Sequence, residues 1–211
     1  MTDNIGIAYF CIIRNNSVIL NGDTVFSHKG DFREFSETLY KKLNPSYPKF
    51  YKMDNLSRLG FLTAELLLSG KNMAAKHRSD RIAMVLANSS SSLDTDRKHQ
   101  KSISSEDAYF PSPSVFVDTL PNVVMGELCI RHGIHGEGCF FVMEGFNPGF
   151  ISEYSRLLIS GDVADCCIAG WVECDGDVYE SGFFLIEKTR MGEEGSTIFS
   201  AGNIRSIFYQ E

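Results

Sequence analysis

The sequence predicts an α/β fold, in which a mixed, mostly parallel five-stranded sheet with flanking helices is closed by a C-terminal antiparallel hairpin. Two observations predict it. Short apolar runs alternate along the chain with segments whose apolar residues repeat at helical spacing. An Asp-Gly turn signal at 175–176 then joins two consecutive apolar runs. With 211 residues, 43% of them hydrophobic, the chain can bury one sizeable core, so we expect a single domain over 1–211.

The first half of the chain holds two predicted strands with two helices between them. Residues 5–13 form an apolar, β-branched run, and residues 81–88 form a second short apolar strand. Asp31 is the expected N-cap of a helix whose apolar residues repeat until Pro45. Leucines at helical spacing predict another helix over 55–69.

The second half begins with a run of four serines at 89–92. This run and the polar stretch after it lack apolar periodicity, so we expect a surface loop or the polar start of a helix. The alternative is that the hydroxyls line a cleft at the end of the preceding strand. The remaining predicted elements are a helix from Pro121 to Gly133, a strand at 139–143, a helix at 148–160, and strands at 164–171, 178–187 and 197–200.

Composition and charge narrow the classes of partner. A net charge of −7 and a pI near 5.3 argue against binding to nucleic acid or to an anionic membrane surface. No apolar stretch of about 18 residues predicts a membrane span, and the start MTDNIGIAYF has no charged region leading to a cleavage site. We therefore expect a cytoplasmic protein.

The cysteines and histidines predict neither a metal site nor a cofactor. Most of the six cysteines lie in apolar runs, where a free thiol behaves as a small hydrophobic group, and no pair has Cys-x-x-Cys spacing. Among the five histidines, His132 and His135 have helical spacing, but the intervening Gly133 is typical of a helix end.

Four stretches between residues 50 and 175 carry a family resemblance. They read YKMDNLSRLGFLTAELLL, RIAMVLANSSSSLDTD, TLPNVVMGELCIRHGIHGEG continuing into CFFVMEGFNPGF, and LLISGDVADCCIAGWVE. In this order they resemble β-ketoacyl-acyl-carrier-protein synthases: the Met-Ser-Arg helix, the Val-Gly-x-x-x-Gly-(Ser/Thr) segment, the Pro-Asn-x-x-x-Gly helix with the nucleophile turn, and the Gly-x-Ala-Asp-x-x-x-Ala-Gly-Gly-x-Glu motif. The resemblance implies the N-terminal half of a thiolase-like fold.

The resemblance places the family's nucleophilic cysteine on a residue without a thiol. Counting forward from Gly136 puts it on Gly145, whereas counting back from Gly161 puts it on Glu144. In the family, the thiolate attacks an acyl thioester at a helix N-terminus, where the helix dipole and backbone amides lower its pKa. A carboxylate cannot replace it, because the resulting anhydride lies uphill from a thioester. We therefore predict no catalytic residue, with Glu144 and Gly145 as a vestigial nucleophile position.

Two further departures concern the histidines and the paired glycines. The family uses two histidines from a C-terminal half to drive decarboxylation, and we expect this chain to end before that half begins. In place of the second glycine of the Gly-Gly motif, Trp171 follows Gly170. A large indole there predicts that the pocket behind the nucleophile turn is filled or reshaped.

The leading functional interpretation is a catalytically inactive ketosynthase-like subunit. By the resemblance, it would pair with an active β-ketoacyl-ACP synthase, in the manner of a chain length factor, in type II fatty-acid or polyketide-like biosynthesis. An active ketosynthase subunit and an acyl carrier protein would then be its partners. Phe141, Met143 and Phe146 are the candidate substrate-binding residues, although aromatic residues on a strand are more often core.

Two alternatives stay open from the sequence. Glu144 in an apolar setting would have a raised pKa and could serve a thioester decarboxylase or hydrolase. The competing interpretation of this same residue is that Glu144 only stabilises the positive end of a nearby helix. The second alternative is a self-associating acyl-binding half-domain, because a lone half of such a fold leaves apolar surface that a second copy would cover.

Overall fold

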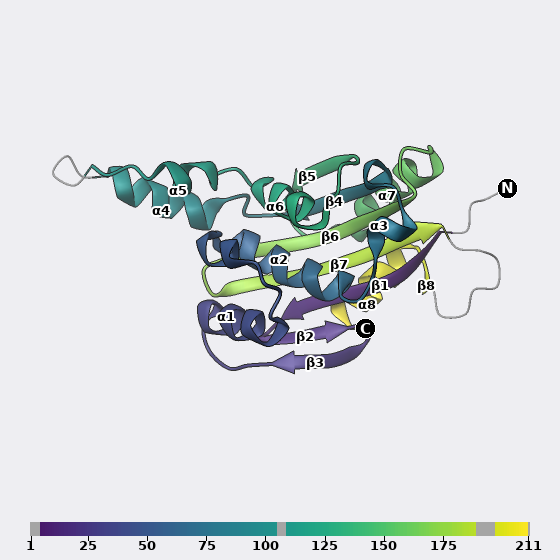
Figure 1. Ribbon diagram of the computed structural model, residues 1–211, viewed down its shortest axis with the longest axis horizontal. Coiled ribbons are helices and arrows are strands. Elements are labelled where there is room, and N and C mark those ends of the chain that lie inside the picture. The colour runs from purple at the N-terminus through teal and green to yellow at the C-terminus, as the bar shows by residue number, and fades with distance from the viewer. Residues whose placement is uncertain (1–4, 105–108, 189–196, 211) are drawn as a thin grey trace.

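The computed structural model describes residues 5–104, 109–188 and 197–210, and within them eight strands form one sheet (Figure 1). Seven of the strands follow the order β3-β2-β1-β7-β6-β4-β5, and β8 pairs with β1. The strands are β1 Ile5–Arg14, β2 Ser17–Leu20, β3 Asp23–Ser27, β4 Ile82–Asn88, β5 Gly138–Val142, β6 Cys166–Asp175, β7 Val178–Lys188 and β8 Thr197–Ile198.

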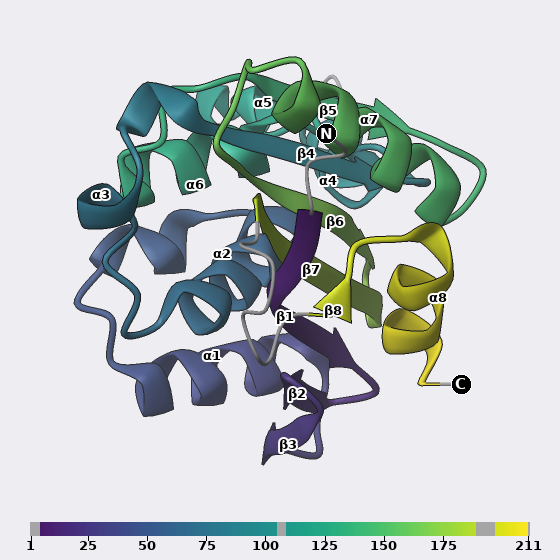
Figure 2. The same cartoon turned by 90° about the vertical axis from the view of Figure 1, so that its right-hand side faces the viewer.

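Helices cover both faces of this sheet. The α-helices are α1 Phe32–Leu43, α2 Asn55–Leu68, α3 Met73–Lys76, α4 Leu93–Ile103, α5 Pro113–Val117, α6 Val123–His132, α7 Pro148–Ser160 and α8 Ala201–Tyr209, and the short 3₁₀ helices are η1 Pro48–Lys52 and η2 Ser79–Arg81. Figure 2 shows α1 and α2 on one side of the sheet and α8 on the other. In Figure 1, α4 and α5 extend beyond the end of the sheet as an arm.

The strands divide the core into two layers by simple alternation. Cys166 and Ile168 of β6 face the layer formed with α1, α2 and α6, whereas Cys167 and Ala169 face the layer formed with α7 and α8. Alternate side chains of a strand point to opposite faces, so a strand buried on both faces reads as a continuous apolar run. Every residue of β4 is buried for the same reason.

The α/β class and most predicted elements are confirmed. Asp31 caps α1 by accepting from the Glu34 N–H, and Gly133 ends α6 with φ of 64°. The turn after β6 has Gly176 at φ of 65°, as its Asp-Gly sequence predicts. No helix in the described part of the chain is long and apolar enough to cross a membrane.

The sheet is larger and more antiparallel than predicted. Among the described strands, β4 pairs in parallel with β5 and β6, and the other strand pairs are antiparallel. The hairpins of β1, β2 and β3 add strands at one edge, where Asn15, Asn16 and Asn21 take positive φ in the turns. The predicted strand at 197–200 is only β8, which pairs with β1. The sequence did not predict α8 or the full length of α4.

Gly170 fixes how closely β6 approaches β7. A Cβ at this position would lie 1.9 Å from the carbonyl oxygen of Gly182 on β7. Because the obstacle is backbone within a ladder of antiparallel bonds, side-chain rotation cannot relieve it.

We predict that Gly170→Ala lowers the free energy of unfolding by about 3 kcal/mol or more, since it forces the two central strands apart. Urea unfolding measures the change. The matched control is Gly202→Ala in the first turn of α8, where the nearest atom to a new Cβ is 3.9 Å away. That variant should stay within about 0.5 kcal/mol of the wild type. Equal losses in the two variants would contradict the close approach.

Candidate functional site

The turn between β5 and α7 is the strand-to-helix turn at which the resemblance places a nucleophile. Its start is fixed by the Met143 N–H, which donates to the Asn88 carbonyl at 2.8 Å. Its end is fixed by the Asn147 side chain, which accepts from the Phe150 N–H at 3.0 Å and caps α7. Pro148 occupies the first turn of the helix, as the sequence predicts. The strand, the capped helix and the turn between them that the resemblance implies are therefore present.

Glu144 and Gly145 form the exposed tip of this turn. A Cβ on Gly145 would have no atom within 4 Å, so the tip faces open space. The Glu144 side chain lies in solvent rather than in the apolar setting that acid-base chemistry at this position requires. What the turn offers chemically is one solvated carboxylate near a helix N-terminus, where its charge is stabilising.

The space behind the turn is filled by three aromatic rings, which we call the aromatic plug: Phe146, Trp171 and Phe208. The Phe146 ring centroid lies 5.8 Å from that of Trp171 and 4.3 Å from that of Phe208. Trp171 is 2% exposed and Phe208 is fully buried. The sequence places an indole behind the turn, and the Trp171 ring of β6 does lie beside the Phe146 ring of the turn.

Phe208 is held in the plug by two neighbours outside it. Its ring packs on Gly182, where an added Cβ would come within 2.5 Å of the ring. The guanidinium carbon of Arg14 lies 4.5 Å from the ring centroid, and the same guanidinium donates to the Phe208 carbonyl. The C-terminal helix is therefore part of the closure behind the turn.

Phe141 and Met143, like Phe146, pack against the core layer of α7 and α8. The Phe141 ring makes edge contacts with Phe150 at 4.7 Å and Tyr154 at 5.1 Å. All three candidate substrate-binding residues are thus partly buried, and all three pack against the same core layer. Their neighbour Phe140 on β5 points to the other face, where it lines a cavity of about 480 Å³ beside α6.

The serine run at 89–92 is bound to Glu173 of β6. The Glu173 carboxylate accepts from the backbone N–H and hydroxyl groups of both Ser89 and Ser90. Ser91 takes a positive φ of 53°, and its N–H donates to the Asn88 side chain. These hydrogen bonds stabilise the turn that precedes α4. The Ser89 and Ser90 hydroxyls therefore bind Glu173 within the turn rather than lining a cleft.

Cys139 does not lie at the tip of the turn. It stands on β5, and its sulfur lies 3.1 Å from the Tyr154 hydroxyl on α7. This hydrogen bond raises the pKa of Tyr154. The Cys139 thiol is thus hydrogen-bonded to a side chain of α7 and lies away from the tip of the turn.

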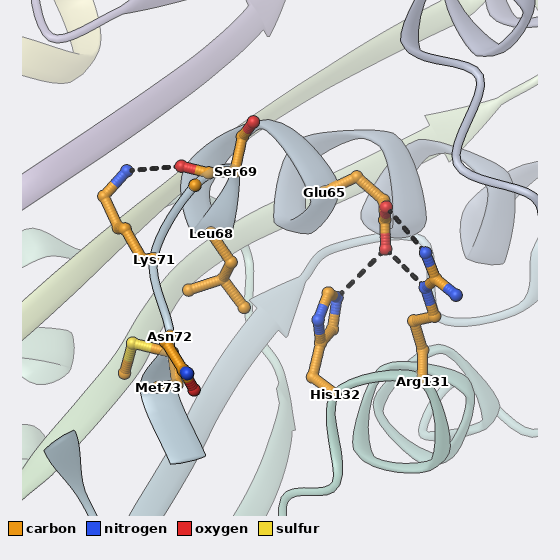
Figure 3. Close-up of a pocket in the computed structure, with 9 residues that line it drawn as sticks. Glu65, Leu68, Ser69, Lys71, Asn72, Met73, Arg131 and His132 are labelled. Carbon is orange, nitrogen blue, oxygen red and sulfur yellow. Dashed lines mark hydrogen bonds and ion pairs between the residues drawn. The ribbon is translucent and has the colours of Figure 1, made fainter. Parts of the chain in front are cut away.

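A polar cavity of about 460 Å³ lies between the C-terminal ends of α2 and α6, on the sheet face opposite α7 (Figure 3). In it, the Glu65 carboxylate accepts from Arg131 at 2.7 and 3.1 Å, and His132 Nε2 lies 3.5 Å from it. The hydrogen bond with Glu65 raises the pKa of Arg131, whereas burial lowers the pKa of His132. Glu65 therefore neutralises Arg131, whereas Lys71 is a second cation in the lining and donates to the Ser69 carbonyl at 3.4 Å.

Carboxylates crowd the base of the arm formed by α4 and α5. Burial, followed by the charges of Asp54 and Glu127, raises the pKa of Asp118 to about 6. Lys49 opposes this shift, but it forms an ion pair with Glu127 at 2.6 Å. The ionised form of Asp118 is therefore disfavoured in the folded protein.

Comparison with known proteins identifies the fold. No protein-family model and no curated protein matches the sequence. Among solved structures, the ishigamide ketosynthase/chain length factor matches with a TM-score of 0.66 at 16% identity, over 90% of this chain and 63% of that chain. The AntDE:AntF complex, a type II PKS acyl-carrier protein with its ketosynthase bound to the hexaketide, matches with a TM-score of 0.65 at 13% identity, over 92% and 65%.

A third match is the ketosynthase ApeO in complex with its chain length factor ApeC from Xenorhabdus doucetiae. Its TM-score is 0.55 at 13% identity, over 89% of this chain and 80% of that chain. The protein therefore has a thiolase-like fold of the ketosynthase and chain length factor type, as the sequence motifs imply. It spans less than two thirds of the length of the first two neighbours.

We predict that Phe208→Ala lowers the free energy of unfolding by about 3–5 kcal/mol, because it opens a cavity in the aromatic plug. Trp171 is the single tryptophan, so its fluorescence reports on the plug, and its emission should shift toward that of a hydrated indole. Leu157→Ala on α7, at a side chain 65% exposed, is the control and should change neither quantity. Unchanged Trp171 emission in Phe208→Ala would contradict the packing.

We also predict that Asp118→Asn stabilises the protein at pH 8 by about 1 kcal/mol, a value discounted because the group is partly exposed. The folded-state pKa near 6 exceeds the unfolded value of 3.8, so ionisation destabilises the fold as pH rises through 6. The gain should nearly vanish at about pH 3, below the unfolded value of 3.8, where the carboxyl is mostly protonated in both states. Urea unfolding at the two pH values tests this, with Asp23→Asn on exposed β3 as control. A gain that is the same at both pH values would contradict the assignment.

Proposed function

We propose that the protein is a catalytically inactive ketosynthase-like subunit that pairs with an active β-ketoacyl-ACP synthase, in the manner of a chain length factor. The observation that carries this proposal is the nucleophile turn, which keeps its strand, cap and helix but has Glu144 and Gly145 at its tip. A thiolate there would accept an acyl group, whereas a solvated carboxylate does not. The fold supports a type II fatty-acid or polyketide-like context, with acyl carrier protein as a second partner.

The closure behind the turn supports the same conclusion. A condensing site needs room beside the nucleophile for an acyl chain, and here the aromatic plug takes that room. Restoring a thiol at the tip would leave this space closed. The proposed role is therefore to present a surface to a partner whose own turn is intact.

The partner surface that we propose combines the free edge of β5 with the arm. Among the described strands, β5 pairs only with β4, so its other edge presents free backbone groups. The arm and the segments flanking α5 add large exposed apolar side chains: Tyr109, Phe110, Phe116, Val117 and Leu120, with exposures of 55–78%. An apolar group of this kind on an acidic protein is typical of a protein interface.

The solved neighbours show that the fold forms such pairs in other proteins. ApeO is in complex with its chain length factor ApeC, and the AntDE:AntF structure holds an acyl-carrier protein in complex with its ketosynthase. A second copy of this chain would also cover the edge of β5 and the arm. The decarboxylase or hydrolase alternative has no supporting geometry, since Glu144 is solvated.

The test is to purify the tagged protein from its native lysate and to identify what accompanies it. We expect a ketosynthase with an intact cysteine and an acyl carrier protein. The double variant Phe116→Asp/Leu120→Asp should lose the ketosynthase, because it places charge on the apolar arm. Leu157→Asp, at an equally exposed leucine on α7, should keep it.

Two results would contradict the proposal. One is recovery without a ketosynthase, with sedimentation showing a homodimer that the arm variant dissociates, since this favours self-association. The other is turnover of malonyl carrier protein by the wild type that Glu144→Gln abolishes. Equal and negligible rates in those two proteins are expected.

A further inference from the structure

Three metal-ligating side chains converge at the end of the sheet near α3, away from the nucleophile turn. They are His77, which follows α3, Cys166 at the start of β6, and Glu187 near the end of β7. One ligand atom of each lies within 4.8 Å of the others. The cysteine is fully buried, and the His77 and Glu187 side chains are 10% and 8% exposed.

The fold dictates this convergence. Cys166 and Glu187 are direct cross-strand partners in the antiparallel β6–β7 ladder, so their side chains lie on the same face. The segment after α3 places the His77 side chain beside both residues, with His77 Nε2 at 2.8 Å from Glu187 Oε1. The three residues are far apart in sequence and have no metal-ligand spacing, which is why the sequence predicted no site.

A buried carboxylate requires a positive partner, and here that partner, Lys76, has a largely exposed side chain. Lys76 Nζ lies 2.5 Å from Glu187 Oε2, but its side chain is 60% exposed. The Cys166 thiol lies beside this carboxylate as its cross-strand partner. A cation at the centre of the three residues would stabilise both the thiolate and the carboxylate.

We propose that His77, Cys166 and Glu187 form a binding site for Zn²⁺ or a divalent cation of similar ligand preference. Sulfur, imidazole nitrogen and carboxylate oxygen are the donors that Zn²⁺ takes, at about 2.0 to 2.3 Å. Tetrahedral ligands at those lengths lie about 3.3 to 3.8 Å apart. Small side-chain rotations would therefore widen the 2.8 Å separation of His77 and Glu187 and shorten any that now exceeds this range. Three protein ligands leave a fourth position for water.

Binding has a defined charge balance. The Cys166 S–H bond breaks, its proton leaves to the buffer, and a metal–sulfur bond forms. The thiolate and the Glu187 carboxylate then neutralise the two charges of the cation. Lys76 turns outward into water, since its ammonium no longer has an anion to pair with. This site is independent of the partner role proposed above.

The test is titration of the full-length wild-type protein with Co²⁺, as a spectroscopic probe for Zn²⁺. One equivalent should give the absorption band of thiolate ligation, and Zn²⁺ should remove it. Cys166→Ser should lose the band, whereas Cys167→Ser should keep it. Cys167 is an ideal control, because it is the neighbouring, equally buried cysteine on the opposite face of the sheet.

Two more variants keep the test decisive should Cys166→Ser fail to fold. His77→Gln, at a surface segment, should weaken Co²⁺ binding by more than about 100-fold. Lys76→Gln should strengthen it about tenfold, because a competing positive charge is removed. The absence of a thiolate band in the wild type at millimolar Co²⁺, or equal binding by wild type and His77→Gln, would overturn the proposal.

Discussion

The packing of Phe146 against Trp171 and Phe208 is the interaction on which the functional interpretation of this molecule depends. It joins three distant parts of the chain: the nucleophile turn, the central strand β6 and the C-terminal helix α8. It is possible because Gly182 stands opposite Trp171 on β7 and leaves room for the Phe208 ring. The turn that carries Glu144 and Gly145 and the packing behind it are therefore parts of one structural unit.

The same packing gives the second face of the sheet its cover. Helix α8 lies beside α7 and buries Ile204 and Phe208 against the strands. The first face is covered by α1, α2 and α6, so both apolar faces are buried within the described chain. Several large exposed apolar side chains are consecutive or nearly so on the arm and the segments flanking α5, whereas those on other elements, such as Leu157 on α7 and Val178 on β7, are single. This distribution is why the arm, rather than the α7–α8 face, carries the proposed partner surface.

The sequence predicted those parts of the fold that local physics determines. Asp31 and Gly133 are end signals whose capping does not depend on distant residues, and the turn at 175–176 likewise follows from its own two residues. It did not predict α8, because the burial of its apolar residues depends on a tertiary contact between Phe208 and Gly182. It also missed the cluster around Glu187, because cross-strand register brings those residues together and sequence spacing does not show register.

The central claim, that the space behind the turn is closed to an acyl chain, has a direct test in the fluorescence of Trp171. The protein is titrated with acyl carrier proteins that carry saturated chains of increasing length. A closed plug predicts that Trp171 emission stays constant for every chain, while the same thioesters change it in Phe208→Ala. A saturable emission change in the wild type that grows with chain length would contradict the account, since it would place the acyl chain beside the indole.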